Sequence, residues 1–150
     1  MNGLFKVAQV NTRHSKAVWA SLGQAAQEEH LDVVLIQEPP PQLVMEDNIW
    51  PGFRIAFATP LPAHSIIMYR TTLGCTNCDF LGSRVCGIQM PFRGSPLVFI
   101  SAYIRHTSGD GVNQLSNAIA KASAMSPFVF VGMDSNGHSP FVGPGGDQIG

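Results

Sequence analysis

Apolar residues along the chain gather into short runs separated by turn-forming residues, and two longer segments repeat apolar residues at helical spacing. The short runs are rich in Val, Ile, Leu and Phe, the composition expected of β-strands. TPLPAH (59–64) and PFRGSP (91–96) have the composition of turns, and each joins two of these runs. The predicted strands are residues 4–10, 33–38, 53–58, 65–69, 85–90, 97–104 and 128–131, the last of them short and buried.

Two segments have the period of an amphipathic helix. Ser15 is the expected N-cap of a helix that runs to about Glu29, and a second helix is expected from about Gly111 to Met125. The order β-α-β, hairpin region, β-α-β predicts a layered α/β or α+β domain over residues 1–150. The expected apolar helix faces are Val18, Trp19, Leu22, Ala25 and Ala26, and Val112, Leu115, Ile119 and Ala122.

The stretch VVLIQEPPPQ (33–42) sets a carboxylate directly against a buried strand. Its continuous apolar run is typical of a strand covered on both faces, and the prolines force the chain out of the sheet after Glu38. In α/β folds ligands bind beyond the carboxyl ends of strands, so a side chain placed there faces a cleft. Glu38 is therefore either a site residue or a solvated loop glutamate.

Composition limits the classes of function. The 150 residues are 45% hydrophobic and 13% charged, which is typical of a globular protein. The net charge of −1 shows no basic stripe, so composition alone does not argue for binding to nucleic acid. No apolar run approaches the ~18 residues of a membrane-spanning helix, and the N-terminus does not resemble a secretory signal. Three cysteines suit a reducing compartment better than a disulfide framework. We expect a protein of the nucleus or cytoplasm without a membrane partner.

Polar side chains lie at or just after the ends of four of the predicted strands. Carboxylate and amide oxygens suit Mg²⁺, which is held by one or two carboxylates plus substrate phosphates. A water near such a cation can attack phosphorus while a second carboxylate takes its proton. The residues are Asn11, Glu38 and Tyr103, followed by Asp134, Asn136 and His138 after the last strand.

Four motifs in order, QVN (9–11), QEP (37–39), SAY (101–103) and GMDSNGH (132–138), resemble those of the endonuclease/exonuclease/phosphatase superfamily. The sequence is most similar to the apurinic/apyrimidinic-type endonuclease domain of non-long-terminal-repeat retrotransposons. NTRHSKAVWASL and the D-x-N-x-H motif followed by SPFVGP carry that similarity. The resemblance implies a four-layered α/β sandwich, in which two packed mixed sheets carry helices on their outer faces.

The resemblance also implies roles for single residues. Glu38 matches the glutamate that ligates the catalytic Mg²⁺, for which Mn²⁺ can substitute, and Asn11 matches the asparagine beside it in the metal and phosphate site. Tyr103 matches the tyrosine whose phenol lies against the scissile phosphate. Arg13 and Arg105 are candidates for contact with the DNA backbone.

The loop after the last predicted strand is implied to supply the remaining chemistry. Asp134 matches the aspartate that orients or deprotonates the attacking water, and Asn136 the asparagine that contacts phosphate and water. His138 belongs to the retrotransposon form of this loop, and its role stays open. Together these residues imply Mg²⁺-dependent cleavage of a DNA phosphodiester.

The function implied is nicking of target DNA, so that the 3′-hydroxyl primes reverse transcription, within a polyprotein that includes a reverse transcriptase. One alternative is a phosphatase or phosphodiesterase of the same superfamily. Another is an inactive transposon-derived fragment, because the family's last motifs, including an aspartate–histidine pair, would fall beyond Gly150. The chain resembles the N-terminal two-thirds of the domain, so the sandwich is expected to be incomplete at the C-terminus. We expect the 150 residues alone to be nearly inactive and self-associated.

Structural interpretations of the same residues stay open at this stage. Tyr103 suits a buried strand, Asp134 suits a turn, and Arg13 suits the start of a helix. Arg84, like Arg105, could contact phosphate or form a surface ion pair. The C-x-x-C motif formed by Cys75 and Cys78, with Cys86 nearby, is a weak zinc signal without a second pair.

Overall fold

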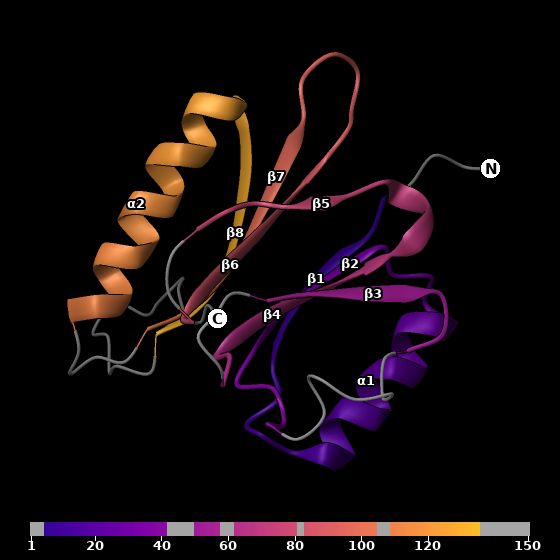
Figure 1. The fold of residues 1–150 in the computed structure, drawn as a ribbon. Helices are drawn as coiled ribbons and strands as arrows, with labels where there is room; N and C mark the ends of the chain where they lie inside the picture. The colour runs from indigo at the N-terminus through magenta and orange to yellow at the C-terminus, as the bar shows by residue number, and fades with distance from the viewer. Residues whose placement is uncertain (1–4, 42–49, 58–61, 81–82, 105–108, 136–150) are drawn as a thin grey trace, which may run out of the picture.

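The computed structural model describes residues 5–41, 50–57, 62–80, 83–104 and 109–135. Two four-stranded sheets pack face to face, and each carries one long helix on its outer face (Figure 1). The layers are therefore helix, sheet, sheet and helix, and the sandwich expected from the resemblance is confirmed. Within the described ranges, no helix is both long and apolar enough to cross a membrane.

The first sheet has the strand order β1-β2-β4-β3. Strands β1 and β2 are parallel and are joined by helix α1, whereas β4 runs antiparallel to both β2 and β3. All five residues of β2 are buried, as the continuous apolar run predicted. The bounds are β1 Val7–Asn11, α1 Lys16–Glu28, β2 Val33–Gln37, β3 Phe53–Phe57 and β4 Ser65–Arg70.

The second sheet has the strand order β5-β6-β7-β8. Strands β6 and β7 form the predicted antiparallel pair. Strands β7 and β8 are parallel, and helix α2 connects them in the sequence. A two-residue strand, β5, and a short 3-10 turn before it were not predicted. The bounds are η1 Thr71–Leu73, β5 Thr76–Asn77, β6 Val85–Met90, β7 Leu97–Ile104, α2 Gly109–Met125 and β8 Phe128–Ser135.

Helix α1 begins as predicted, with Ser15 as its N-cap: the Ser15 hydroxyl accepts a hydrogen bond from the Val18 N–H at 3.1 Å. The predicted buried face is wrong at Val18, which is 41% exposed. The face that packs on the sheet contains Trp19, Gly23 and Ala26, whose spacing of three and four residues matches the helical period. Val18 lies about 100° around the helix from Trp19, on the solvent side.

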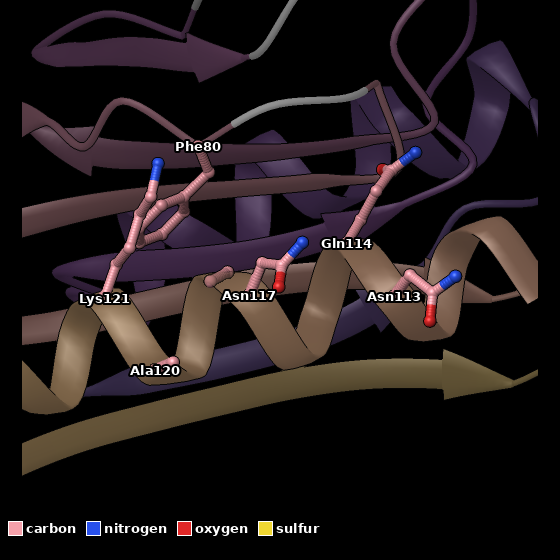
Figure 2. Close-up of a pocket in the computed structure, with 7 residues that line it drawn as sticks. Phe80, Asn113, Gln114, Asn117, Ala120 and Lys121 are labelled. Carbon is pink, nitrogen blue, oxygen red and sulfur yellow. The ribbon is translucent and has the colours of Figure 1, made fainter.

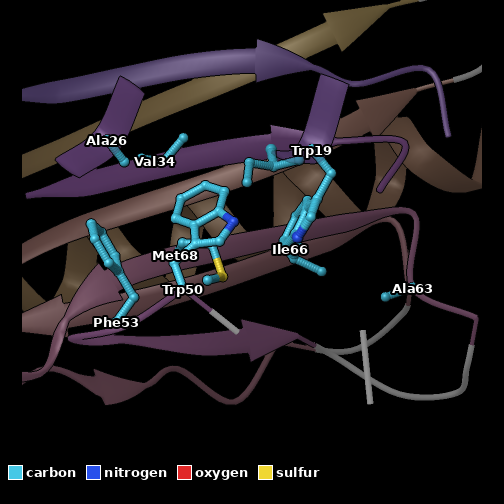
Figure 3. Close-up of a cluster of buried hydrophobic side chains, with 9 residues drawn as sticks. Trp19, Ala26, Val34, Trp50, Phe53, Ala63, Ile66 and Met68 are labelled. Carbon is cyan, nitrogen blue, oxygen red and sulfur yellow. The ribbon is translucent and has the colours of Figure 1, made fainter. Parts of the chain in front are cut away.

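A cluster of aromatic side chains fills the space between α1 and the first sheet (Figure 3). The Trp50 ring lies 5.0 Å from the Trp19 ring and 5.3 Å from the Phe53 ring, edge-on to the latter. A Cβ on Gly23 would lie 2.6 Å from Trp50 Nε1, so glycine is needed in mid-helix for this close approach. Apolar side chains of the two sheets form a second cluster between them, and a third lies beneath α2.

Strand β8 differs from the short buried strand predicted for Phe128–Val131. It continues to Ser135, and much of its apolar surface is exposed, because β8 lies at the edge of the second sheet. Strand β2 also ends one residue earlier than predicted, so Glu38 lies just outside the sheet.

Candidate active site

The carboxyl ends of β1 and β2 in the first sheet meet those of β7 and β8 in the second. One contact that joins them is a hydrogen bond from Asn11 Nδ2 at the end of β1 to Asp134 Oδ2 near the end of β8. Tyr103 is the β7 residue paired with Asp134. Asn11 is paired with Gln37, which directly precedes Glu38. We call Asn11, Glu38, Tyr103 and Asp134 the strand-end site.

The backbone of Glu38 is held on both sides in a left-handed conformation, with φ of 52°. Its N–H donates to the His64 carbonyl at 2.9 Å. Its own carbonyl accepts from the Thr12 hydroxyl at 2.7 Å and from the His14 N–H at 2.8 Å. Non-glycine residues adopt positive φ at a cost, so these hydrogen bonds offset the strain and fix the start of the side chain.

The Glu38 carboxylate remains accessible at the rim of the site. The side chain is 18% exposed, and His14 Nε2 lies 3.9 Å from Glu38 Oε2, a weak ion pair when the imidazole is protonated. An accessible carboxylate on a fixed backbone suits a metal ligand, since carboxylate oxygen is a preferred donor for Mg²⁺. The metal-ligand role that the resemblance implies for Glu38 stays a prediction, as does the solvated-glutamate interpretation.

Asn11 is oriented from two directions. Its Oδ1 accepts a hydrogen bond from the Arg13 N–H at 2.7 Å, an Asx-type turn, while its Nδ2 donates to Asp134. The amide therefore points its donor at the carboxylate, and no second donor to Oδ1 comes from the described residues, which keeps one of its lone pairs available among them. The Arg13 side chain is exposed beside the site.

Tyr103 is buried, at 3% exposure, and its ring stacks with the His64 ring at a centroid distance of 6.2 Å. This position agrees both with a buried tyrosine of a strand and with a tyrosine whose phenol lies at the site, because the end of β7 is buried and is also part of the site. Its backbone N–H donates to the Arg84 carbonyl at 2.9 Å. Arg84 Nη1 is buried and finds no hydrogen-bond acceptor in the described part of the chain.

Three predicted site residues, Arg105, Asn136 and His138, lie outside the described residues. Three residues that sequence interpretation missed lie directly beneath the site: Thr12, Gln37 and Ser101 are buried polar residues. The available signal was a polar residue at an otherwise apolar strand position, as in VVLIQ and LVFISAYI.

The cysteines do not form a metal site within the described ranges, where no group of three or more His, Cys, Asp or Glu side chains could hold an ion. All three are free thiols. Burial raises the pKa of Cys75 and of Cys78 to about 11, and it raises the pKa of Cys86 further. The free thiols therefore hold their protons at neutral pH, and a metal ion would have to displace those protons to bind.

The donor set of the strand-end site fits a hard divalent cation. It consists of two carboxylates, one amide oxygen and one phenol, without sulfur or a described imidazole ligand, and oxygen donors select Mg²⁺ or Mn²⁺ over zinc. The site lies apart from a cavity of about 480 Å³ beside α2, on the flank of the helix that faces Phe80 (Figure 2). That cavity is lined by amide side chains, Phe80 and Lys121, and shares no residue with the strand-end site.

No protein-family model and no curated protein sequence matches the chain. Among solved structures, it is similar to the endonuclease domain of TRAS1, a telomere-specific non-LTR retrotransposon, with a TM-score of 0.73 and 19% identity. That match covers 97% of this chain and 68% of the TRAS1 chain.

Two further structures have TM-scores of 0.56 and 0.59. One is D. rerio TDP2 complexed with a single-strand DNA product, with 13% identity over 90% of this chain and 62% of the other. The other is an endonuclease/exonuclease/phosphatase family protein from Bacteroides thetaiotaomicron, with 14% identity over 87% and 61%. The chain thus spans about two thirds of the length of these structures, and it shares the fold of the endonuclease/exonuclease/phosphatase proteins.

Proposed function

We propose that the chain carries the metal and water-activating part of a divalent-cation-dependent DNA endonuclease. The observation that carries this proposal is the hydrogen bond between Asn11 and Asp134, which joins the two sheets at the strand ends beside Glu38. Residues far apart in sequence converge there with the oxygen donors that phosphodiester hydrolysis needs.

The residues divide the chemistry between them. Glu38 and the free lone pair of Asn11 Oδ1 would hold the cation, which supplies positive charge to the phosphate oxygens when bound. Asp134, oriented by Asn11, accepts the proton of the attacking water. The Tyr103 phenol donates toward a phosphate oxygen, and the exposed Arg13 side chain pairs with the DNA backbone.

The specific role proposed is that of a retrotransposon endonuclease, nicking target DNA to prime reverse transcription in a polyprotein with a reverse transcriptase. The fold similarity to the TRAS1 endonuclease domain and the retrotransposon-like motifs support this role. The DNA product in the TDP2 structure supports DNA as the substrate class. We propose a nuclear or cytoplasmic protein, as expected for an enzyme that acts on target DNA.

Metal binding tests the assignment of Glu38. We expect Mn²⁺, followed by its free-ion EPR signal, to bind the wild-type chain and to bind Glu38→Gln at least about 10-fold more weakly, because a ligand is lost. Glu29→Gln is the matched control, since Glu29 is an exposed glutamate at the end of α1. Equal Mn²⁺ affinity in wild type and Glu38→Gln would show that Glu38 is not a ligand, and a stoichiometric, tightly held zinc would revive the cysteine interpretation.

Substrate class is tested with labelled duplex DNA in fluorescence anisotropy, with and without Mg²⁺. We expect Mg²⁺ to strengthen DNA binding in wild type but not in Glu38→Gln. Hydrolysis of small phosphoesters without DNA binding would favour the phosphatase alternative.

A further inference from the structure

We propose that Gln37, with Ser101 as its partner, is a positioning residue that sets the distance between the two sheets directly beneath the strand-end site. The proposed function gives this distance its importance, because Asn11 and Asp134 must meet across it. The contacts themselves do not depend on that function.

The Gln37 side chain is fully buried and bonded to both sheets. Its Nε2 donates to Ser101 Oγ on β7 at 3.0 Å and to the Gly132 carbonyl on β8 at 3.3 Å. Its Oε1 accepts a hydrogen bond from Gln9 Nε2 on β1. One amide therefore connects β2 to β1 within the first sheet and to both β7 and β8 in the second.

The second bridge runs in the opposite direction. Ser101 Oγ donates to the Ile36 carbonyl on β2 at 3.1 Å while accepting from Gln37. Ser101 and Gly132 are paired residues of β7 and β8, so both bridges lie at one level of the sandwich. We call Gln9, Gln37, Ser101 and Gly132 the polar layer.

Three members of the polar layer lie one step below the strand-end site on their own strands, and the fourth, Gln37, is paired with Asn11. Gln9 precedes Asn11 by two residues, Ser101 precedes Tyr103 by two, and Gly132 precedes Asp134 by two. Side chains two apart on a strand face the same way, so each site residue stands next to a member of the layer. Gln37 directly precedes the fourth site residue, Glu38.

The backbone of β8 also lies close to the first sheet at this level. A Cβ on Gly132 would lie 2.7 Å from Leu35 Cδ1 and 2.8 Å from Gln9 Cγ, so no side chain fits there. Buried polar groups left without partners are costly, and a network whose members satisfy one another in a single arrangement therefore fixes that arrangement. Apolar contacts are non-directional, so an apolar layer would not by itself specify which groups meet across the two sheets.

Two variants test the proposal: Gln37→Met, which keeps length and volume but removes the amide, and Ser101→Ala, which removes one oxygen and is the milder change. Ser126→Ala is the matched control. Ser126 is also a buried serine, but it bonds the Pro96 and Phe128 backbone at the opposite end of β7 and β8. The first readout is the NMR signal of the Asn11 side-chain NH₂, with Asp134→Asn as the reference for a lost contact. The second is Mn²⁺ affinity.

All three variants are expected to lower the melting temperature. Only Gln37→Met and Ser101→Ala are expected to move the Asn11 NH₂ signal toward its position in Asp134→Asn and to weaken Mn²⁺ binding about 10-fold, the effect of losing support behind a ligand. If Gln37→Met does not fold, the Asn11 NH₂ signal and the Mn²⁺ affinity of Ser101→Ala test the proposal. Variants that melt early but leave the Asn11 signal unchanged would overturn the proposal. A wild type that binds no Mn²⁺ would refute the proposed function, and the Asn11 signal would still decide the role of Gln37.

Discussion

Backbone strain is concentrated at the strand-end site. Five non-glycine residues in the described part of the chain have positive φ, and three of them, Arg13, His14 and Glu38, surround the site. Such conformations persist only where neighbouring contacts enforce them, as the hydrogen bonds from Thr12 and His14 to the Glu38 carbonyl do. Single residues here are thus placed by contacts with segments distant in sequence.

The thiols give a prediction at the same scale. Because burial raises the pKa of Cys78 to about 11, this thiol stays protonated in the folded chain at pH values where the unfolded chain, with a pKa of about 8.5, has lost the proton. The unfolded state then binds fewer protons, so the free energy of unfolding falls as pH rises from about 9 to about 11. Urea unfolding at several pH values should show a shallower fall for Cys78→Ala. Parallel curves for the two proteins would contradict the prediction.

At the scale of elements, Arg70 at the end of β4 ties the first sheet to the end of α1. Its Nε donates to the Leu31 carbonyl at 2.9 Å, its Nη2 to the Ala26 carbonyl at 3.1 Å and its Nη1 to Gln27 Oε1 at 3.2 Å. The guanidinium also lies 4.2 Å from the centre of the Phe53 ring. A positive charge at carbonyls near a helix C-terminus is favourable, so this one side chain fixes how α1 ends.

We therefore expect Arg70→Lys to destabilise the chain, since an ammonium cannot reproduce the forked hydrogen bonds. The expected loss is about 1.5–3 kcal/mol in the free energy of unfolding, the range for hydrogen bonds to charged groups. Urea unfolding measures it, and Arg54→Lys on β3, where the arginine is exposed, should change stability by less than about 0.5 kcal/mol. Equal effects of the two substitutions would rule out a special role for Arg70.

At the scale of the whole molecule, β8 leaves apolar surface uncovered. Among the described strands it pairs on one side only, with β7. Its exposed side chains carry no charge, and edge strands without charges or proline are prone to pair with other chains. The exposed apolar residues are Phe128 and Phe130, each 49% exposed, with Val131 at 41% and Met133 at 46%.

We expect the purified 150-residue chain to self-associate through β8. Analytical ultracentrifugation should show concentration-dependent dimers or larger species, and Phe130→Lys or Val131→Lys should shift the population toward monomer, because a buried charge opposes pairing. Phe92→Lys is the control, since Phe92 is 42% exposed but lies in the turn between β6 and β7. A wild-type chain that stays monomeric at all concentrations would contradict this expectation.

The local pattern was sufficient for most elements. Strands β6 and β7, the N-cap at Ser15 and the buried strand before Glu38 follow from apolar periodicity and capping chemistry, which act over a few neighbouring residues. The ordered polar residues at strand ends, with the motifs they form, pointed to the site. Apolar periodicity and helix capping can be recognised in the sequence because they depend on interactions between residues that are close in the chain.

Tertiary structure decided which helix and strand faces are buried and which side chains meet between the two sheets. The exposure of Val18 and of β8 depends on which face meets a sheet and on β8 lying at an edge, and neither follows from periodicity. The contact between Asn11 and Asp134 spans 123 residues, and the bridge from Gln37 to Ser101 spans 64. Such contacts form only after both sheets have packed, so the sequence alone named candidate site residues, while packing decided which of the described ones meet.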